Sequence, residues 1–307
     1  MSNAALAVKP AVHALEIHPV AGRIGAEIRG VHLSGELDAA TVEAIQQALV
    51  QYKVVFFREQ TQLDDQRQEA FAHLLGEPVA HPTVPSREGT RYLLELDGAE
   101  GQRANSWHTD VTFVDAYPKA SILRSVVAPA FGGDTLWANT LWANTATAYN
   151  GLPTELRELA DKLVAVHSNE YDYASAKPDV SAEKLERYRK VFTSTVYETE
   201  HPVVRVHPIS GEKSLLLGHF VKRIKGYSQA DSAHLFGLLQ SHVIRQENTV
   251  RWRWKAGDVA IWDNRSTQHY AIDDYGTQDR VVRRVTLKGE VPVGANGQRS
   301  QTIKGRD

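Results

Sequence analysis

Short β-prone runs lie near both ends of this chain, and the helices between them do not alternate regularly with strands. The runs that predict strands cover residues 54–57, 92–96, 120–128, 250–254, 259–262 and 281–287. Helices are expected over residues 38–52, 64–75 and 228–245, and another is expected to begin at Pro153. Strands at both ends without βαβ alternation predict a mainly β protein with helical additions, folded as a two-sheet jelly roll.

One domain is expected over residues 1–307. Residues 1–13 and 294–307 are expected to be loose tails, because they are polar or rich in small residues. The segment of about residues 168–200 is polar, has scattered tyrosines and shows no clear period. We interpret it as an insertion or lid.

Composition excludes several classes of protein. The net charge is −2 and the basic residues are dispersed, so neither nucleic acid nor an anionic membrane is an expected partner. No secretory signal and no apolar run near the ~20 residues that span a bilayer is visible, which predicts a cytoplasmic protein. The chain has no cysteine, so any metal must be held by nitrogen and oxygen ligands, which suits Fe(II), Mn(II) or Zn(II).

His108 and Asp110 lie two residues apart in an apolar, β-prone run over residues 106–113. In a strand, side chains at i and i+2 project from one face, so an imidazole nitrogen and a carboxylate oxygen could reach one metal ion. A second histidine would complete the two-histidine, one-carboxylate set of non-haem Fe(II) oxygenases. Alone, such a triplet more often marks a structural histidine beside an N-cap or surface aspartate, because chance supplies roughly one or two such triplets per chain of this kind.

The last predicted strand carries arginines at alternate positions. Period two places Arg280, Val282 and Arg284 on one face. On a solvent face these arginines would be ordinary. Inside a jelly roll, where no obvious carboxylate pairs them, they would form a pocket for anions, because guanidinium groups suit carboxylates and sulfur oxyanions. Two arginines therefore suggest two anionic ligands.

Residues 135–139 and 140–144 both read Thr-Leu-Trp-Ala-Asn. Because five is odd, carrying both copies through one strand would turn every later side chain to the wrong face of the sheet. One copy is therefore expected to loop or bulge out.

Together these motifs resemble the taurine dioxygenase family of Fe(II)- and 2-oxoglutarate-dependent oxygenases. The resemblance spans about residues 15–290 and depends on residues 106–110, the turn over 132–135, residues 267–271 around His269, and the closing Arg280 and Arg284. It implies a double-stranded β-helix, the jelly roll of the clavaminate synthase-like proteins. Residues 103–112 and 197–211 look most similar to members that cleave alkyl sulfate esters.

The resemblance implies a role for each of these residues. His108, Asp110 and His269 would be the metal ligands, with no further catalytic residue. The 2-oxoglutarate-binding residues would be Thr135, Arg280 and Arg284, and the substrate-binding residues His81, Val111 and Arg284. Thr140 stays open as the alternative to Thr135, which is preferred because it follows the Gly-Gly-Asp turn directly. His201 and His207, each before a proline, are interpreted as structural, and Trp252 and Trp254 as core.

The implied reaction uses Fe(II), 2-oxoglutarate and O2. It hydroxylates the carbon that bears the ester oxygen of an alkyl sulfate and releases aldehyde, sulfate, succinate and CO2. A sulfonate dioxygenase that releases sulfite is the nearest alternative. A Zn(II) hydrolase with the same ligands and an inactive anion-binding jelly roll are more remote ones. The family further implies a homo-oligomer, either a dimer or a tetramer.

Overall fold

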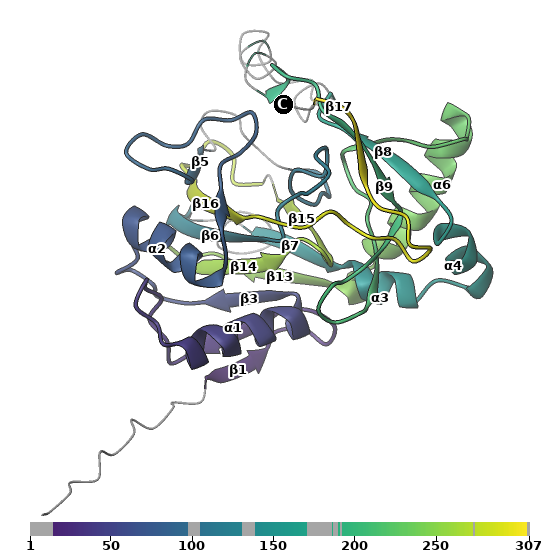
Figure 1. Ribbon diagram of the computed structural model, residues 1–307. Coiled ribbons are helices and arrows are strands. Elements are labelled where there is room, and N and C mark those ends of the chain that lie inside the picture. The colour runs from purple at the N-terminus through teal and green to yellow at the C-terminus, as the bar shows by residue number, and fades with distance from the viewer. Residues whose placement is uncertain are drawn as a thin grey trace, which may run out of the picture.

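The computed structural model describes residues 15–97, 105–130, 139–170, 186, 190, 192–272 and 274–305. Its centre is a pair of sheets flanked by helices (Figure 1). The larger sheet has the order β1-β2-β3-β14-β6-β16-β4, with β5 also paired to β16, and the smaller has the order β13-β7-β15. Further sheets have the orders β12-β8-β9-β17 and β10-β11.

The strands of the larger sheet are β1 (Glu16–Pro19), β2 (Ala26–Arg29), β3 (Val54–Phe57), β4 (Pro78–Val79), β5 (Leu94–Asp97), β6 (Ala120–Val127), β14 (Val259–Asp263) and β16 (Val281–Leu287). The smaller sheet contains β7 (Asn139–Asn144), β13 (Thr249–Arg253) and β15 (Thr267–Ala271). The other strands are β8 (Val164–Ser168), β9 (Glu198–Pro202), β10 (Val204–Val206), β11 (Lys213–Leu215), β12 (Val221–Ile224) and β17 (Gln301–Lys304). The helices are α1 (Ala39–Tyr52), α2 (Asp65–Leu75), α3 (Thr145–Asn150), α4 (Thr154–Ala160) and α6 (Gln229–Val243), with a 3-10 turn at Gln246–Asn248.

A buried aromatic cluster joins the two central sheets. Phe56 of the larger sheet stacks on Trp252 of the smaller one, with ring centroids 4.0 Å apart, and also meets the ring of Trp142 edge-on. On the other face of the larger sheet, α1 and α2 cover a second cluster that includes Ile45 and Phe71. The predicted two-sheet core, with Trp252 and Trp254 inside it, is confirmed.

The N-terminal part contains a parallel strand pair that the sequence did not predict. Strands β2 and β3 pair in parallel and are joined by α1, so β2, α1 and β3 form one βαβ unit. Strand β2 has only four residues, which is too short for a clear period. The start of α1 follows the prediction, because the Asp38 side chain accepts a hydrogen bond from the Thr41 N–H at 2.9 Å.

The predicted loose tail over residues 294–307 is wrong in part, because β17 pairs antiparallel with β9. Strand β17 is polar and lies at a sheet edge, where backbone hydrogen bonds hold it without an apolar pattern. The helical spacing of the apolar residues in α6 predicts that Leu238 faces inward, but its side chain is 48% exposed. Residues 1–13 and most of the predicted lid, between Ser168 at the end of β8 and Glu198 at the start of β9, lie outside the described residues.

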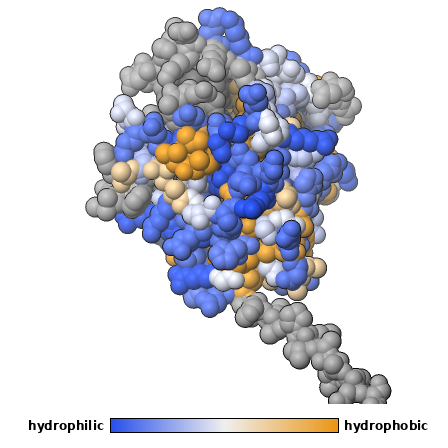
Figure 2. All heavy atoms as spheres, turned by 90° about the vertical axis from the view of Figure 1, so that its left-hand side faces the viewer, coloured by the Kyte–Doolittle hydropathy of each residue, from blue (hydrophilic) through white to orange (hydrophobic). Residues whose placement is uncertain are grey.

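The face of the molecule turned toward the viewer in Figure 2 is largely hydrophilic and interrupted by separate hydrophobic areas. Within the described part of the chain, no helix is long and apolar enough to cross a membrane.

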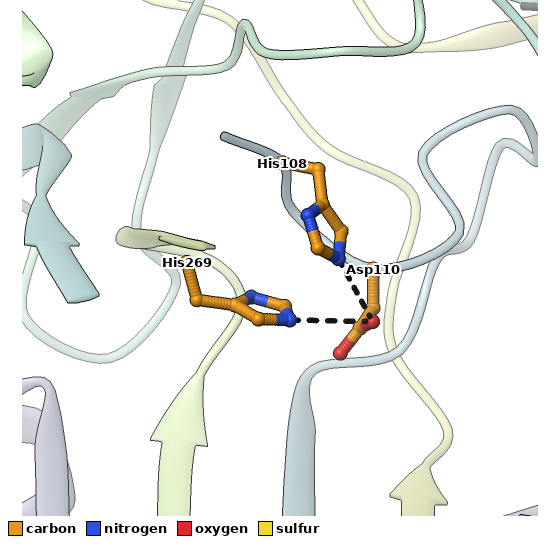
Figure 3. A group of neighbouring side chains, drawn as sticks. All are labelled: His108, Asp110 and His269. Atoms are coloured by element: carbon orange, nitrogen blue, oxygen red, sulfur yellow. Dashed lines mark ion pairs between the residues drawn. The ribbon is translucent and has the colours of Figure 1, made fainter. Parts of the chain in front are cut away.

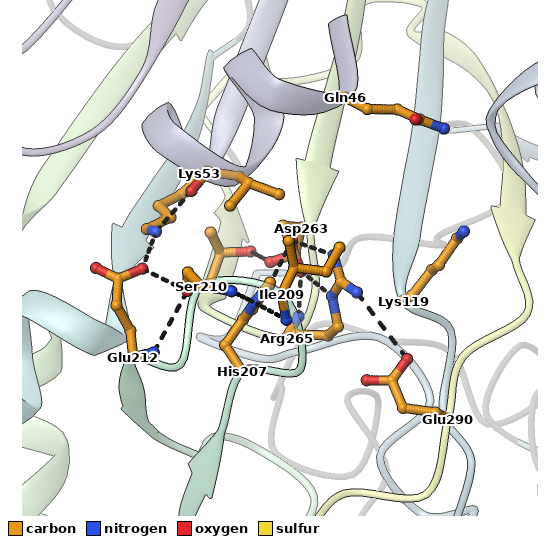
Figure 4. Close-up of polar contacts among 12 residues, drawn as sticks. Gln46, Lys53, Lys119, His207, Ile209, Ser210, Glu212, Asp263, Arg265 and Glu290 are labelled. Atoms are coloured by element: carbon orange, nitrogen blue, oxygen red, sulfur yellow. Dashed lines mark hydrogen bonds and ion pairs between the residues drawn. The ribbon is translucent and has the colours of Figure 1, made fainter. Parts of the chain in front are cut away.

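A buried charged cluster lies where β14 ends (Figure 4). The Asp263 carboxylate is fully buried and accepts hydrogen bonds from Arg265 Nε at 2.9 Å and Nη2 at 2.7 Å. His207 Nε2 lies 3.0 Å from the same carboxylate and ties the β10–β11 hairpin to it. Burial alone would raise the pKa of Asp263. Arg265 and His207 lower this pKa by more than burial raises it, so the pKa lies below its ordinary value.

Candidate metal centre

Residues 106–113 do not form the predicted strand. His108 makes an isolated bridge with His269, in which the His108 N–H bonds the His269 carbonyl at 3.0 Å and the His269 N–H bonds the His108 carbonyl at 2.8 Å. The chain then turns over residues 110–113, with Val111 at a φ of 58°. A turn, and not the predicted alternation of a strand, therefore brings Asp110 to His108.

The structure brings together the three predicted ligand residues, His108, Asp110 and His269 (Figure 3). All three side chains are buried, and one potential ligand atom from each lies within 4.8 Å of the others. The Nε2 atoms of His108 and His269 lie 3.9 Å and 3.8 Å from Asp110 Oδ1. Since β15 supplies His269 and the turn supplies Asp110, two distant parts of the chain form one cluster.

The protonation state of the two histidines suits metal binding. His108 Nδ1 lies 2.8 Å from the Ser106 carbonyl, which can only accept, so Nδ1 carries the proton and Nε2 keeps its lone pair. Burial lowers the pKa of His108 to about 4 and that of His269 well below its ordinary value. Both rings are therefore neutral near pH 7 and available as ligands.

Asp110 is held ionised by its neighbours. Ser121 Oγ donates a hydrogen bond to Asp110 Oδ2 at 2.7 Å, and the Arg284 guanidinium contacts Oδ1. Burial alone would raise the pKa of the carboxyl group. The charge of Arg284 lowers it more, joined by the charges of the two histidines at pH values low enough to protonate them, so the pKa lies below the usual range.

The arginines of β16 divide between its two faces, as period two predicts. Arg284 is buried and contacts Asp110, whereas Arg283 pairs with Asp65 and Glu95 on the opposite face. Arg280, just before the strand, is 7% exposed and is not directed into bulk water. The expectation that Arg284 has no carboxylate partner is wrong, because that partner is the candidate ligand Asp110.

Two further predicted site residues lie near this cluster. Val111 is buried beside Asp110 and belongs to an apolar cluster with Phe113, Phe192 and Phe220. The His81 ring lies 5.8 Å from that of Phe192. Burial and then the charge of Arg284 lower the pKa of His81 to about 3, so the ring is neutral near pH 7.

The hydrogen bonds of the His81 ring define which of its two nitrogens carries the proton. Its Nδ1 accepts hydrogen bonds from the backbone N–H groups of Thr83 at 3.3 Å and Val84 at 3.1 Å. In the neutral ring the proton is therefore on Nε2, which can donate to an anionic oxygen.

Strand β7 is built from the second Thr-Leu-Trp-Ala-Asn copy. Trp142 pairs with His269 and Thr140 with Ala271, so Thr140 shares the sheet face of Trp142 and His269. Trp254 Nε1 donates to the Thr140 hydroxyl at 3.0 Å. Thr135 and the Gly-Gly-Asp turn lie outside the described residues, so their prediction is not tested.

Sequence reasoning missed three groups that hold the site. Ser121 reaches Asp110 from β6, Ser106 fixes the ring of His108, and Thr109 Oγ1 donates to the Thr267 carbonyl at 2.7 Å. Each contact except that of Ser106 joins residues more than ten positions apart. No local pattern marks a serine or threonine for such a role.

Comparison with known proteins shows which protein family the chain belongs to. A family model described as "Taurine catabolism dioxygenase TauD, TfdA family" matches residues 16–286, and the chain belongs to this family. The predicted resemblance to that family is confirmed.

Two relatives are especially similar. An alpha-ketoglutarate-dependent sulfate ester dioxygenase of Pseudomonas putida is 78% identical over 99% of each chain. An alkylsulfatase of Acinetobacter baylyi is 61% identical over 95% of this chain and 91% of the relative. A crystal structure of a taurine dioxygenase from Burkholderia xenovorans superposes with a TM-score of 0.79 at 37% identity, covering 95% of both chains. The jelly-roll prediction is confirmed.

Proposed function

We propose that this protein is an Fe(II)- and 2-oxoglutarate-dependent dioxygenase that cleaves alkyl sulfate esters. The observation that carries the proposal is one buried cluster in which His108, Asp110 and His269 converge and Arg284 contacts the same carboxylate. The two relatives named for sulfate esters and alkyl sulfates support this substrate class.

The donor set of the cluster fits an iron ion. Two neutral imidazoles and one ionised carboxylate are the ligands of non-haem Fe(II) oxygenases, and such a facial set leaves positions open for other ligands. Arg284 Nε is buried and has no hydrogen-bond partner among the described residues, which suits a site that receives an anion. When bound, iron and 2-oxoglutarate supply the oxidation: O2 converts 2-oxoglutarate to succinate and CO2 and oxygenates a substrate carbon.

The side chains around the cluster suit an alkyl sulfate. Arg284 and the Nε2–H of His81 would donate to the sulfate oxygens. The apolar cluster with Val111, Phe113 and Phe220 would contact the alkyl chain and exclude water. Anchored in this way, the substrate would direct the carbon that bears the ester oxygen toward His108, Asp110 and His269, which would hold the iron. Hydroxylation of this carbon gives a hemiacetal-like sulfate, which collapses to an aldehyde and inorganic sulfate.

Arg280 and a threonine hydroxyl would bind 2-oxoglutarate. The position of Thr140 in β7 supports this residue over Thr135, because it shares a sheet face with His269. Trp254 occupies an acceptor site of the Thr140 hydroxyl and so leaves its proton free to be donated to a carboxylate.

We expect Thr140→Val to raise the KM for 2-oxoglutarate by roughly tenfold or more, because a hydrogen bond to a charged group contributes about 1.5–3 kcal/mol. Thr140→Ser keeps the hydroxyl and should retain a KM near that of the native enzyme. Thr135→Val should leave the KM unchanged. Steady-state kinetics at a fixed alkyl sulfate concentration measures all three, and the reverse ranking of the two valine variants would assign the role to Thr135.

The sulfur product tests the proposed function. With Fe(II), 2-oxoglutarate and O2, an alkyl sulfate should release inorganic sulfate and succinate in equal amounts, while taurine releases little sulfite. Preferential release of sulfite would support the sulfonate dioxygenase instead. Sulfate release that continues without O2 would support a hydrolase and contradict the proposal.

A further inference from the structure

The turn that presents Asp110 contains a strained residue. Val111 has a φ of 58°, in the left-handed region that β-branched residues rarely adopt. Such a conformation costs about 1–3 kcal/mol and persists only where the surrounding structure holds it. Because Val111 directly follows Asp110, whatever holds this turn also directs the candidate ligand.

Buried side chains from the sheet of β8 and β9 hold the residues that follow Val111. His201 Nε2 donates to the Thr112 carbonyl at 2.7 Å, and His167 Nδ1 lies 2.9 Å from the Thr112 hydroxyl. Thr199 Oγ1 donates to the Phe113 carbonyl at 2.8 Å. His167, Thr112, Thr199 and His201 are fully buried, so water does not compete for these bonds.

The His201 ring is itself held from its other side. Its Nδ1 lies 2.6 Å from Ser300 Oγ, just before β17. Because Nε2 carries the ring proton and donates to a carbonyl, Nδ1 of the neutral ring accepts a hydrogen bond from the Ser300 hydroxyl. Burial keeps the ring neutral by lowering its pKa to about 4. A chain of two hydrogen bonds thus runs from Ser300 through His201 to Thr112.

We propose that His201 is a positioning residue of the metal centre, which acts through the Thr112 carbonyl to hold the Val111 turn and so direct Asp110 toward His108 and His269. This inference rests on the proposed role of Asp110 as a metal ligand. In this proposal His201 does more than fill the core. Once its hydrogen bond to Thr112 is lost, the strained turn at Val111 relaxes and Asp110 is no longer directed toward the two histidines. His207, also buried and also followed by a proline, bonds Asp263 and not the turn.

The test is Mn(II) affinity, measured by the electron paramagnetic resonance signal of free Mn(II), without 2-oxoglutarate or substrate. His201→Phe keeps a ring in the core but cannot donate to Thr112. Its dissociation constant for Mn(II) should rise about 10- to 100-fold, the range typical of lost outer-shell partners. His201→Gln can still donate an amide N–H and should recover most of the affinity. His207→Phe should keep native affinity although its melting temperature falls.

Native Mn(II) affinity in His201→Phe, measured well below its melting temperature, would overturn the inference. An equal loss of affinity in His207→Phe would do the same. If His201→Phe does not fold, Ser300→Ala replaces it, because it leaves the ring in place and removes the hydroxyl that orients it. Its dissociation constant should rise, and an unchanged value would contradict the proposal. Failure of the native protein to bind Mn(II) would instead contradict the proposed function.

Discussion

Replacing His269 by alanine should abolish metal binding and sulfate release together. The variant leaves one imidazole and one carboxylate, and it removes a ligand that no other histidine near Asp110 can supply among the described residues. The expected loss of metal affinity is larger than the roughly 100-fold that loss of an outer-shell partner costs. Equilibrium dialysis against Mn(II) and the release of sulfate from an alkyl sulfate measure the two effects.

His242→Ala is the matched control for this prediction. His242 is 8% exposed, close to the 6% of His269, but it lies at the end of α6 and outside the cluster. This variant should retain both metal binding and turnover. Persistent O2-dependent sulfate release by His269→Ala would show that the ligand assignment is wrong.

Asp263→Asn should have the largest effect on stability. The substitution removes the buried carboxylate of the Arg265 guanidinium and leaves it only the 41% exposed Glu290 carboxylate, 4.0 Å away, among the described residues. Loss of one partner of a buried ion pair costs about 3–5 kcal/mol. The free energy of unfolding from urea denaturation measures this loss. The pKa of Asp263 is lower in the folded than in the unfolded chain, so its contribution is complete above about pH 4 and shrinks as the pH falls further.

Glu77→Gln provides the comparison for Asp263→Asn. Glu77 pairs with Lys288 at 2.9 Å, but both side chains are more than half exposed. Exposed pairs contribute about 0–1 kcal/mol, because water and salt screen them. Similar losses in the two variants would mean that the buried cluster in Figure 4 does not stabilise the fold through its charges.

Features set by neighbouring residues were predictable from the sequence. Asp64 caps α2, as its place before the apolar residues of that helix indicates. Arg283 and Arg284 lie on opposite faces of β16, as the period of a strand requires. The second tandem copy lies in β7, but residues 135–138 of the first copy lie outside the described residues, so the expected loop or bulge stays a prediction.

Features set by distant residues were not predictable. The apolar run over residues 106–113 favours a strand, yet hydrogen bonds from His201 and Thr199 hold a turn there. Ser121 contacts Asp110 only because of the register between β6 and its neighbours. Strand β17 depends on the edge of β9 and has no apolar alternation of its own. In each case tertiary contacts decide the local structure.

We propose that His108, Asp110 and His269 hold an iron ion to which 2-oxoglutarate binds. Anaerobic addition of Fe(II) and 2-oxoglutarate, followed by visible absorption spectroscopy, tests it most directly. We expect a charge-transfer band that shifts when an alkyl sulfate is added and that is missing in Asp110→Ala. A spectrum without this band in the native protein, or an undiminished band in Asp110→Ala, would contradict the claim.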